Sequence, residues 1–178
     1  MATHVALLRG VNVGGKSLVK MAELQQAAAA AGLQDVQTYI QSGNIIFSSD
    51  ITDPDKIAAI VKAAIQKSFV LDIGVAVFSK AAWQKIIKSA PRDWGHDETK
   101  RHNLLVLIKP YDVNEVMTTI GELKPEVETL TAGNGVIYHS LSIKLHTRTR
   151  LTRVVGRPVY KQMTIRNYNT ASKLLALM

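Results

Sequence analysis

Hydrophobic and polar positions form two different patterns along the first 80 residues. Short apolar runs predict strands, and apolar residues that recur every three or four positions predict helices. We expect, in chain order, a strand at 4–9, a glycine-rich loop at 10–16, a helix at 21–31, a hairpin of strands at 36–40 and 44–48, a helix at 53–69 and a strand at 73–79. This βαββαβ order is typical of the ferredoxin-like fold.

The same order of elements returns in the second half. After a connecting helix at 81–89 and a polar linker at 91–102, we expect a strand at 104–108, a helix at 113–120 capped by Asp112, strands at 127–130 and 136–140, a helix at 142–155, a strand at 161–165 and a helix at 170–178. The sequence therefore predicts an α+β protein with two ferredoxin-like subdomains, each an antiparallel sheet flanked by helices. We place them at residues 1–80 and 103–178, joined by 81–102.

Composition excludes several classes of protein. Hydrophobic residues make up 47% of the chain and charged residues 20%, which suits a packed core. Because there is no cysteine, disulfide scaffolds, thiolate zinc sites and iron–sulfur clusters are excluded. The histidines show no metal-ligand spacing, so we expect neither a metal nor a cofactor. With no long apolar run and no signal-peptide pattern, we expect a cytoplasmic protein that does not engage a membrane.

The net charge of +8 lies entirely in the last 50 residues. Residues 1–128 hold 14 basic and 14 acidic residues, whereas residues 129–178 hold eight basic residues and no acid. This asymmetry indicates an acidic partner such as nucleic acid or a phosphorylated ligand, although a solvated basic face explains it equally well. If 142–155 is helical, His146, Arg150 and Arg153 form a basic patch on one of its faces.

The glycine-rich loop matches the P-loop pattern G-x-x-x-x-G-K-[ST] from Gly10 to Ser17. No apolar strand supplies an Asp for magnesium, the expected sheet is not parallel, and the next helix begins several residues beyond Lys16. These points argue against nucleotide hydrolysis. The loop is then a turn between strand and helix, or a site where the amides of Gly14 and Gly15, with Arg9 and Lys16, bind an anion.

Two further polar segments are candidates for ligand binding. In the hairpin, Gln41, Ser42 and Asn44 either satisfy backbone groups of the turn or contact a ligand. In the turn before the last helix, Asn167, Asn169 or Thr170 can cap the helix, beside Arg166. That arginine either forms an oxyanion site with the helix amides or pairs with an acid elsewhere.

Four blocks of the sequence together resemble the bacterial family known as domain of unknown function 1697: ALLRGVNVGG, KMAEL, TYIQSGNIIF and TIRNYNTASKLL. The resemblance implies two ferredoxin-like subdomains and a cytoplasmic protein, and it implies no reaction. Tyr168 stands where the family typically has Trp. The family's signature positions correspond here to Arg9, Gly10, Asn12, Gly14, Gly15, Lys20, Tyr39, Gln41, Ser42, Gly43, Asn44, Arg166, Asn167, Asn169 and Thr170.

Three functions fit these observations. The first is binding of a phosphate-bearing or other anionic ligand, such as a nucleotide, a phosphorylated metabolite or RNA, in a cleft near the glycine-rich loop. We expect this cleft to collect the three irregular segments, with ligand-binding residues Arg9, Gly10, Asn12, Gly14, Gly15, Lys16, Gln41, Ser42, Asn44, Arg166 and Asn167. The second is an enzyme that acts on a small anionic substrate. The third is a structural or partner-binding protein without a ligand.

Overall fold

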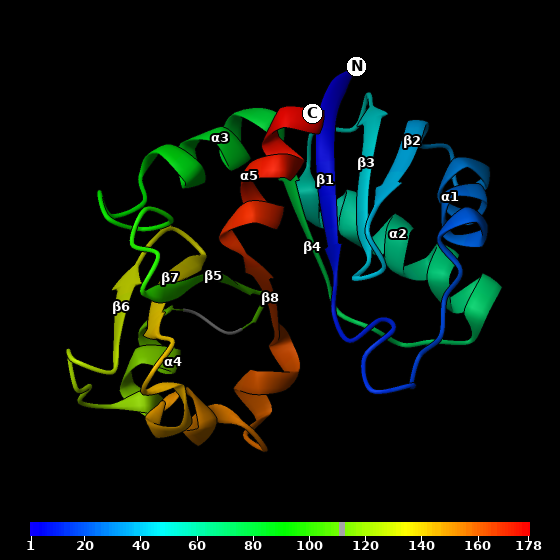
Figure 1. Cartoon of the computed structure of the whole chain (residues 1–178). Coiled ribbons are helices and arrows are strands. Elements are labelled where there is room, and N and C mark those ends of the chain that lie inside the picture. The colour runs from blue at the N-terminus through cyan, green and yellow to red at the C-terminus, as the bar shows by residue number, and fades with distance from the viewer. Residues whose placement is uncertain (111–112) are drawn as a thin grey trace. The chain divides into compact units, whose positions relative to one another are not determined.

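A computed structural model describes residues 1–110 and 113–178 (Figure 1). The chain divides into two compact units, one formed by Met1–Gln84 with Leu174–Met178 and the other by Lys85–Lys173. Asp112, the predicted cap of the helix at 113–120, lies outside the described residues.

The first unit contains one four-stranded antiparallel sheet in the order β2-β3-β1-β4. This order, with helices at the two crossovers, confirms the ferredoxin-like expectation. Its elements are β1 (Ala2–Leu8), α1 (Met21–Ala30), β2 (Gln34–Tyr39), β3 (Asn44–Ser49), α2 (Pro54–Phe69) and β4 (Val75–Ser79), followed by α3 (Lys80–Lys88), which continues into the second unit.

Helices α1 and α2 cover one face of this sheet (Figure 1). Their buried faces contribute Leu24, Ile57 and Val61 to the core, as the apolar spacing predicts. The Asp53 side chain accepts hydrogen bonds from the backbone N–H groups of residues 55 and 56, so the predicted cap of α2 is confirmed. Gly32, with φ +91°, follows the end of α1, where a left-handed residue ends a helix readily.

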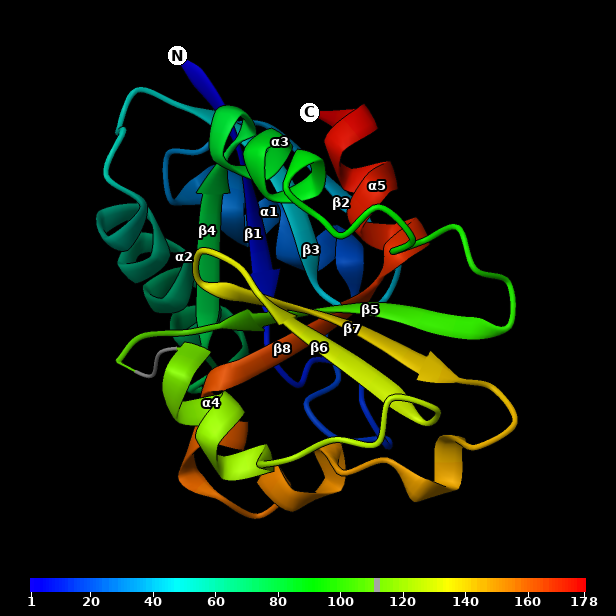
Figure 2. The ribbon, with the colours of Figure 1, turned by 90° about the vertical axis from the view of Figure 1, so that its left-hand side faces the viewer.

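The second unit repeats the strand order in a second antiparallel sheet, β6-β7-β5-β8 (Figure 2). Helix α4 packs on one face of the sheet, with Val116 and Ile120 against Leu105 and Ile137. The elements are β5 (Lys100–Leu107), α4 (Val113–Ile120), β6 (Glu128–Ala132), β7 (Val136–Ser142), β8 (Met163–Asn167) and α5 (Tyr168–Leu177), which continues into the first unit.

The α-helix predicted at 142–155 is wrong. Strand β7 runs to Ser142, and three short 3₁₀ helices then lead to β8: η1 (His146–Arg148), η2 (Leu151–Val154) and η3 (Pro158–Gln162). The backbone N–H of Arg150 donates to the carboxylate of Glu128, not to a carbonyl one turn earlier. Thr149 adopts an extended conformation, φ −58° and ψ 138°, and donates its hydroxyl to the same carboxylate. Hydrogen bonds to the distant Glu128 therefore take the place of the backbone hydrogen bonds that an α-helix would make in this segment.

Three predicted boundaries also shift. Strand β5 begins at Lys100, inside the segment predicted as a linker, because Lys100–His102 pair with β7. Strand β8 begins two residues later than predicted, at Met163. Helix α5 begins at Tyr168, two residues earlier than predicted, because Asn167 caps it.

Within residues 1–110 and 113–178, no helix combines the length and the apolar character needed to cross a membrane. The same residues contain no cluster of three or more His, Cys, Asp or Glu that could hold a metal ion.

Candidate functional site

The glycine-rich loop forms a small hairpin of its own. The backbone N–H of Lys16 donates to the carbonyl of Val13 at 3.1 Å, and Val13 and Lys16 form an isolated antiparallel bridge. Gly14 and Gly15, at the centre of this turn, have φ values of +58° and +73°. Two successive positive φ angles are those of a type I′ turn, which glycine adopts without strain. The loop is therefore a protruding turn with Lys16 exposed at its end.

The structure supports the rejection of a P-loop. The sheet that precedes the loop is antiparallel, and α1 begins only at Met21, beyond Lys16 and Ser17. A P-loop lysine instead opens the helix whose amides hold the phosphate. Ser17 also has a φ of +51°, which is outside the helical region.

Asn12 joins the glycine-rich loop to the β2–β3 hairpin. Its side-chain amide donates to the carbonyls of Val19 and Gln41, both at 2.9 Å, and its Oδ1 accepts from the backbone N–H of Val19 at 2.8 Å. The predicted proximity of these two segments is confirmed. The half-buried side-chain amide of Asn12 therefore makes its hydrogen bonds to the backbone of the protein itself.

Asn44 has a similar role within the hairpin. Buried at the start of β3, it donates from Nδ2 to the carbonyl of Tyr39 at 2.9 Å and to the hydroxyl of Ser42 at 3.0 Å. The carbonyl of Gly43 accepts from the backbone N–H of Leu8 at 2.8 Å, which fixes the turn against β1. The side chains of Asn44 and Ser42 therefore organise the turn, and the contact of Gln41, Ser42 and Asn44 with a ligand stays a prediction.

The predicted basic patch is not a helix face. His146 lies in η1 and Arg153 in η2, with Arg150 between them. The guanidinium of Arg153 donates to the carbonyl of Ile120, the last residue of α4, and that of Arg150 donates to the carbonyl of Glu122, two residues beyond the helix. A helix leaves its last carbonyls unpaired, and cationic side chains satisfy both their hydrogen bonding and the helix dipole. Arg153 therefore stabilises the end of α4, Arg150 holds the segment that follows it, and the expectation of a basic helical stripe is wrong.

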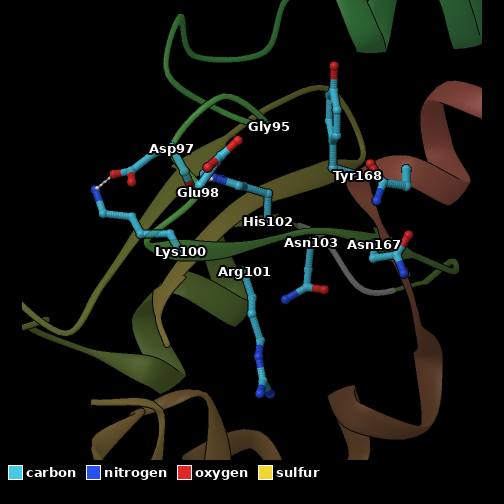
Figure 3. Close-up of a pocket in the computed structure, with 10 residues that line it drawn as sticks. Gly95, Asp97, Glu98, Lys100, Arg101, His102, Asn103, Asn167 and Tyr168 are labelled. Atoms are coloured by element: carbon cyan, nitrogen blue, oxygen red, sulfur yellow. Dashed lines mark hydrogen bonds and ion pairs between the residues drawn. The ribbon is translucent and has the colours of Figure 1, made fainter. Parts of the chain in front are cut away.

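The second unit contains a polar pocket of about 410 Å³ at the end of its sheet, where β5 begins and α5 starts (Figure 3). In the figure, the side chains of Arg101 and Asn103 extend to one side of β5 and that of His102 to the other, as alternation along a strand requires. The lining residues come from the loop before β5, from β5 and from the β8–α5 junction: Gly95, Asp97, Glu98, Lys100, Arg101, His102, Asn103, Asn167, Tyr168 and Asn169.

The wall formed by the loop before β5 is fixed by Asp97. Its Oδ1 accepts hydrogen bonds from the hydroxyl of Thr99 at 2.6 Å and from the backbone N–H of Thr99 at 3.0 Å, and its Oδ2 pairs with Lys100 Nζ at 3.1 Å. The hydrogen bonds from Thr99, with the contribution of Lys100, lower the pKa of Asp97 to about 2. The carboxylate is therefore ionised at neutral pH, and it is occupied by neighbours on its own loop.

His102 is held by both ring nitrogens. Nε2 lies 2.9 Å from the carbonyl of Asp97, and Nδ1 lies 2.9 Å from the hydroxyl of Ser140. A carbonyl only accepts, so Nε2 carries a proton, and in the neutral ring Nδ1 accepts from Ser140.

The opposite wall is the junction of β8 and α5. Asn167 lies directly across from Asn103 in the β5–β8 ladder, and its Oδ1 accepts from the backbone N–H of Thr170 at 2.8 Å. Of the predicted capping residues, Asn167 is therefore the one that caps α5. The Tyr168 ring packs edge-on against Trp94 at a centroid separation of 5.0 Å. Gly95 has no room for a side chain, because a Cβ there would overlap the Tyr168 ring.

Arg166 precedes Asn167 in β8 and lies on the other face of the strand. It is 5% exposed, and its guanidinium donates to the hydroxyl of Thr164 at 2.7 Å and to the carbonyl of Ile165 at 2.9 Å. Burial lowers its pKa to about 10, which leaves it charged at neutral pH. Arg166 is not among the residues that line the pocket, whereas Asn167 is. Arg9 and Arg166 belong to different units, and the predicted cleft that joins them stays a prediction.

Most residues of the pocket were not predicted from the residue pattern. Lys100, Arg101 and His102 lie in the segment interpreted as a linker, and Asn103 was not singled out. The signal that could have found them is the eight-residue run KRHNLLVL, in which a polar half precedes an apolar half. Such a run is typical of a strand that leaves the core and ends at a surface.

Comparison with known proteins places the chain in a family. The family described as "Protein of unknown function (DUF1697)" matches residues 1–138. No curated protein matches the chain. Among solved structures, the chain is similar to the conserved bacterial protein SP0830 from Streptococcus pneumoniae, with 28% sequence identity, a TM-score of 0.86, and coverage of 99% of this chain and 98% of that one. The match over residues 1–138 confirms the resemblance carried by the glycine-rich loop and the hairpin, and the chain therefore belongs to the DUF1697 family.

Proposed function

We propose that this chain binds a small anionic ligand that carries a phosphate group, and that the polar pocket of the second unit holds it. The observation that carries the proposal is the position of Arg101, Asn103 and Asn167. Arg101 and Asn103 share one face of β5, and Asn167 is directly opposite Asn103 on β8. Directly opposed residues of a sheet have Cβ atoms about 5 Å apart. A guanidinium and two side-chain amides thus line one small surface, a donor set suited to phosphate oxygens.

Arg101 supplies the cationic side chain on the face of β5 that Asn103 shares. Of the other charged residues in the lining, Lys100 is paired with Asp97, and Glu98 adds a carboxylate. The first turn of α5 also lies at the pocket through Tyr168 and Asn169. The N-terminus of a helix has a partial positive charge that adds to the charge of Arg101. The pocket volume of about 410 Å³ is in the range of small-molecule sites, roughly 300–1,000 Å³.

Calorimetric titration with inorganic phosphate, AMP and a short single-stranded RNA tests the proposal. Arg101→Gln removes the guanidinium, and Arg92→Gln is the matched control because Arg92 is exposed and is not part of the pocket lining. A hydrogen bond to a charged group contributes about 1.5–3 kcal/mol. We therefore expect Arg101→Gln to weaken phosphate or AMP binding at least roughly tenfold, and Arg92→Gln to bind as the unmodified protein does.

The proposal fails if none of the three probes binds, or if Arg101→Gln binds as tightly as the unmodified protein. A polymeric ligand differs from a small one in its salt dependence, because each neutralised phosphate of a single strand adds about −0.7 to the slope of log K against log salt. Tight RNA binding with a steep slope that Arg101→Gln leaves unchanged would assign the ligand to another surface. The exposed turn at Gly14, Gly15 and Lys16 remains a second predicted anion site.

A further inference from the structure

A row of polar side chains crosses the second sheet, from its buried part to the pocket. His139 of β7 lies directly opposite Asn103 of β5, and Asn103 lies directly opposite Asn167 of β8. Directly opposed residues share one face of a sheet, with Cβ atoms about 5 Å apart. His139 is 1% exposed, Asn103 is half-buried and Asn167 is exposed. The row therefore leads from a buried histidine to two residues that line the pocket.

The buried end of the row has one unsatisfied atom. Nε2 of His139 lies 2.9 Å from Oε2 of Glu128. A carboxylate only accepts, so the proton of the neutral ring is on Nε2 and Nδ1 is a bare acceptor. Burial lowers the pKa of His139, which keeps the ring neutral at pH 7. Within residues 1–110 and 113–178, this buried Nδ1 has no hydrogen-bond partner. Buried polar atoms are nearly always satisfied, so the exception requires a physical reason.

Asn103 carries donors that suit this acceptor. It is directly opposite His139, and its side-chain nitrogen has two N–H groups. On the other side of His139, the β6–β7 ladder brings Leu130, whose side chain has no donor. The hydroxyl of Thr149 is already donated to Glu128. A hydrogen bond from Asn103 to Nδ1 would therefore satisfy the buried acceptor with a neighbour that also lines the pocket.

We propose that His139 is a positioning residue of the anion pocket, whose bare Nδ1 accepts one N–H of the Asn103 side-chain amide and so directs the other N–H to an oxygen of the ligand. The two hydrogens of one amide nitrogen point in different directions, so the amide can serve both acceptors at once. A free side-chain amide presents either its nitrogen or its oxygen, whereas one held by His139 presents a donor. The pocket then selects a ligand that accepts hydrogen bonds. This inference rests on the proposed function, because it assigns a role to Asn103 within that pocket.

Nitrogen-15 NMR of the full chain, with inorganic phosphate as the probe, tests the inference. A bare ring nitrogen shifts upfield when it accepts a hydrogen bond. We expect the Nδ1 signal of His139 in the phosphate-bound protein to lie upfield of its position in Asn103→Ala. His4 serves as the internal control, because it is a buried histidine of the first unit and its Nδ1 lies 2.9 Å from the carbonyl of Ala2. Its Nδ1 signal should be the same in both proteins.

A double-mutant cycle on phosphate affinity shows whether His139 acts through Asn103. His139→Gln can still donate to Glu128 and accept from Asn103, so we expect it to retain the affinity within about twofold. His139→Met can do neither, and it should weaken phosphate binding at least roughly threefold. In the Asn103→Ala background, the same His139→Met substitution should cause no further loss.

The outcomes separate this inference from the proposed function. If phosphate binds but the Nδ1 signal is the same in Asn103→Ala, the inference is overturned and the proposed function stands, because water or another group then supplies the donor. Equal losses from His139→Met in both backgrounds would likewise show a merely structural histidine. If phosphate does not bind the unmodified protein, both proposals fail. Should His139→Met not fold, the NMR comparison and His139→Gln still decide the question, since neither requires that variant.

Discussion

The side-chain amide of Asn12 donates to the carbonyl of Gln41 at 2.9 Å, across 29 positions of the sequence. Together with two hydrogen bonds to Val19, this contact joins the glycine-rich loop to the hairpin. Because Asn12 has a φ of +56°, the residue is suited to the position by its backbone as well as by its side chain. The two contributions can be separated by mutation.

We expect Asn12→Gly to lower the free energy of unfolding by about 1–3 kcal/mol, because it removes three hydrogen bonds but tolerates the positive φ. Asn12→Ala should cost about 1 kcal/mol more, since alanine adds backbone strain. Urea denaturation of the three proteins measures both differences. Equal stability of the Gly variant and the unmodified protein would show that these hydrogen bonds do not stabilise the loop.

Gly43 and Gly14 offer a matched comparison of steric and conformational effects. Both have positive φ, +72° and +58°, but a Cβ on Gly43 would lie 2.8 Å from Leu8 Cβ, whereas a Cβ on Gly14 would meet nothing within 4 Å. We expect Gly14→Ala to cost about 1–2 kcal/mol through backbone strain alone. Gly43→Ala should cost about 2–5 kcal/mol, because overpacking against β1 adds to the strain. Thermal unfolding checks the order, and similar melting temperatures would contradict it.

Arg153 stabilises the end of α4 through its hydrogen bond to the Ile120 carbonyl at 2.9 Å. We expect Arg153→Gln to lower the free energy of unfolding by about 1 kcal/mol, since the carbonyl loses a charged donor. The control is Arg148→Gln, at an exposed position in η1, with the same loss of charge and an expected change within about 0.5 kcal/mol. Equal effects of the two substitutions on stability would show that net charge, and not the helix end, is responsible.

The sheets and most helices could be predicted from the sequence because local signals and tertiary packing agree there. Asp53, Pro54 and the apolar spacing after them all favour the start of one helix, and α2 begins where they indicate. The segment 142–155 could not be predicted, because its conformation depends on Glu128, which is distant in sequence. No local pattern reports such a hydrogen bond, so the basic patch inferred from helical spacing was also wrong.

In the candidate site, too, some features could be predicted from the sequence and others could not. The proximity of the glycine-rich loop to the hairpin follows from the strand order, and it could be predicted. The partners of Asn12 and Asn44 could not, because a polar side chain in a turn binds backbone or ligand equally well on sequence grounds. The pocket of the second unit depends on the β5–β8 register, which brings Asn103 opposite Asn167. Register is set by the whole sheet, and these two residues are 64 positions apart in the sequence.

Glu128 and His139 form a buried pair on the β6–β7 ladder. Nε2 of His139 donates to Glu128 Oε2 at 2.9 Å, and the carboxylate also accepts from the Thr149 hydroxyl and the Arg150 backbone N–H. Burial lowers the pKa of His139 below its ordinary value of 6.5, against the opposing effect of Glu128. Burial alone would raise the pKa of Glu128, but the hydrogen bonds from Thr149, Arg150 and His139 outweigh it, and the net shift is downward from 4.5.

Both shifts predict that acid destabilises the fold. Below about pH 6.5 the unfolded chain takes up a proton at His139 before the folded chain does, and below about pH 4.5 the same holds for Glu128. The stability from both groups is therefore present at neutral pH and is lost as the pH falls through the folded-state pKa values. Glu128→Gln should lower the free energy of unfolding by about 1–3 kcal/mol at pH 7, since the carboxamide keeps one acceptor oxygen, while its NH2 group cannot accept the hydrogen bonds that the other carboxylate oxygen receives from Thr149, Arg150 or His139. Urea denaturation at pH 7 and pH 4 should show this difference narrowing with acid, because the carboxylate of the unmodified protein then approaches protonation. A difference that is constant between the two pH values would mean that the charge of Glu128 does not hold the 3₁₀ segment in place.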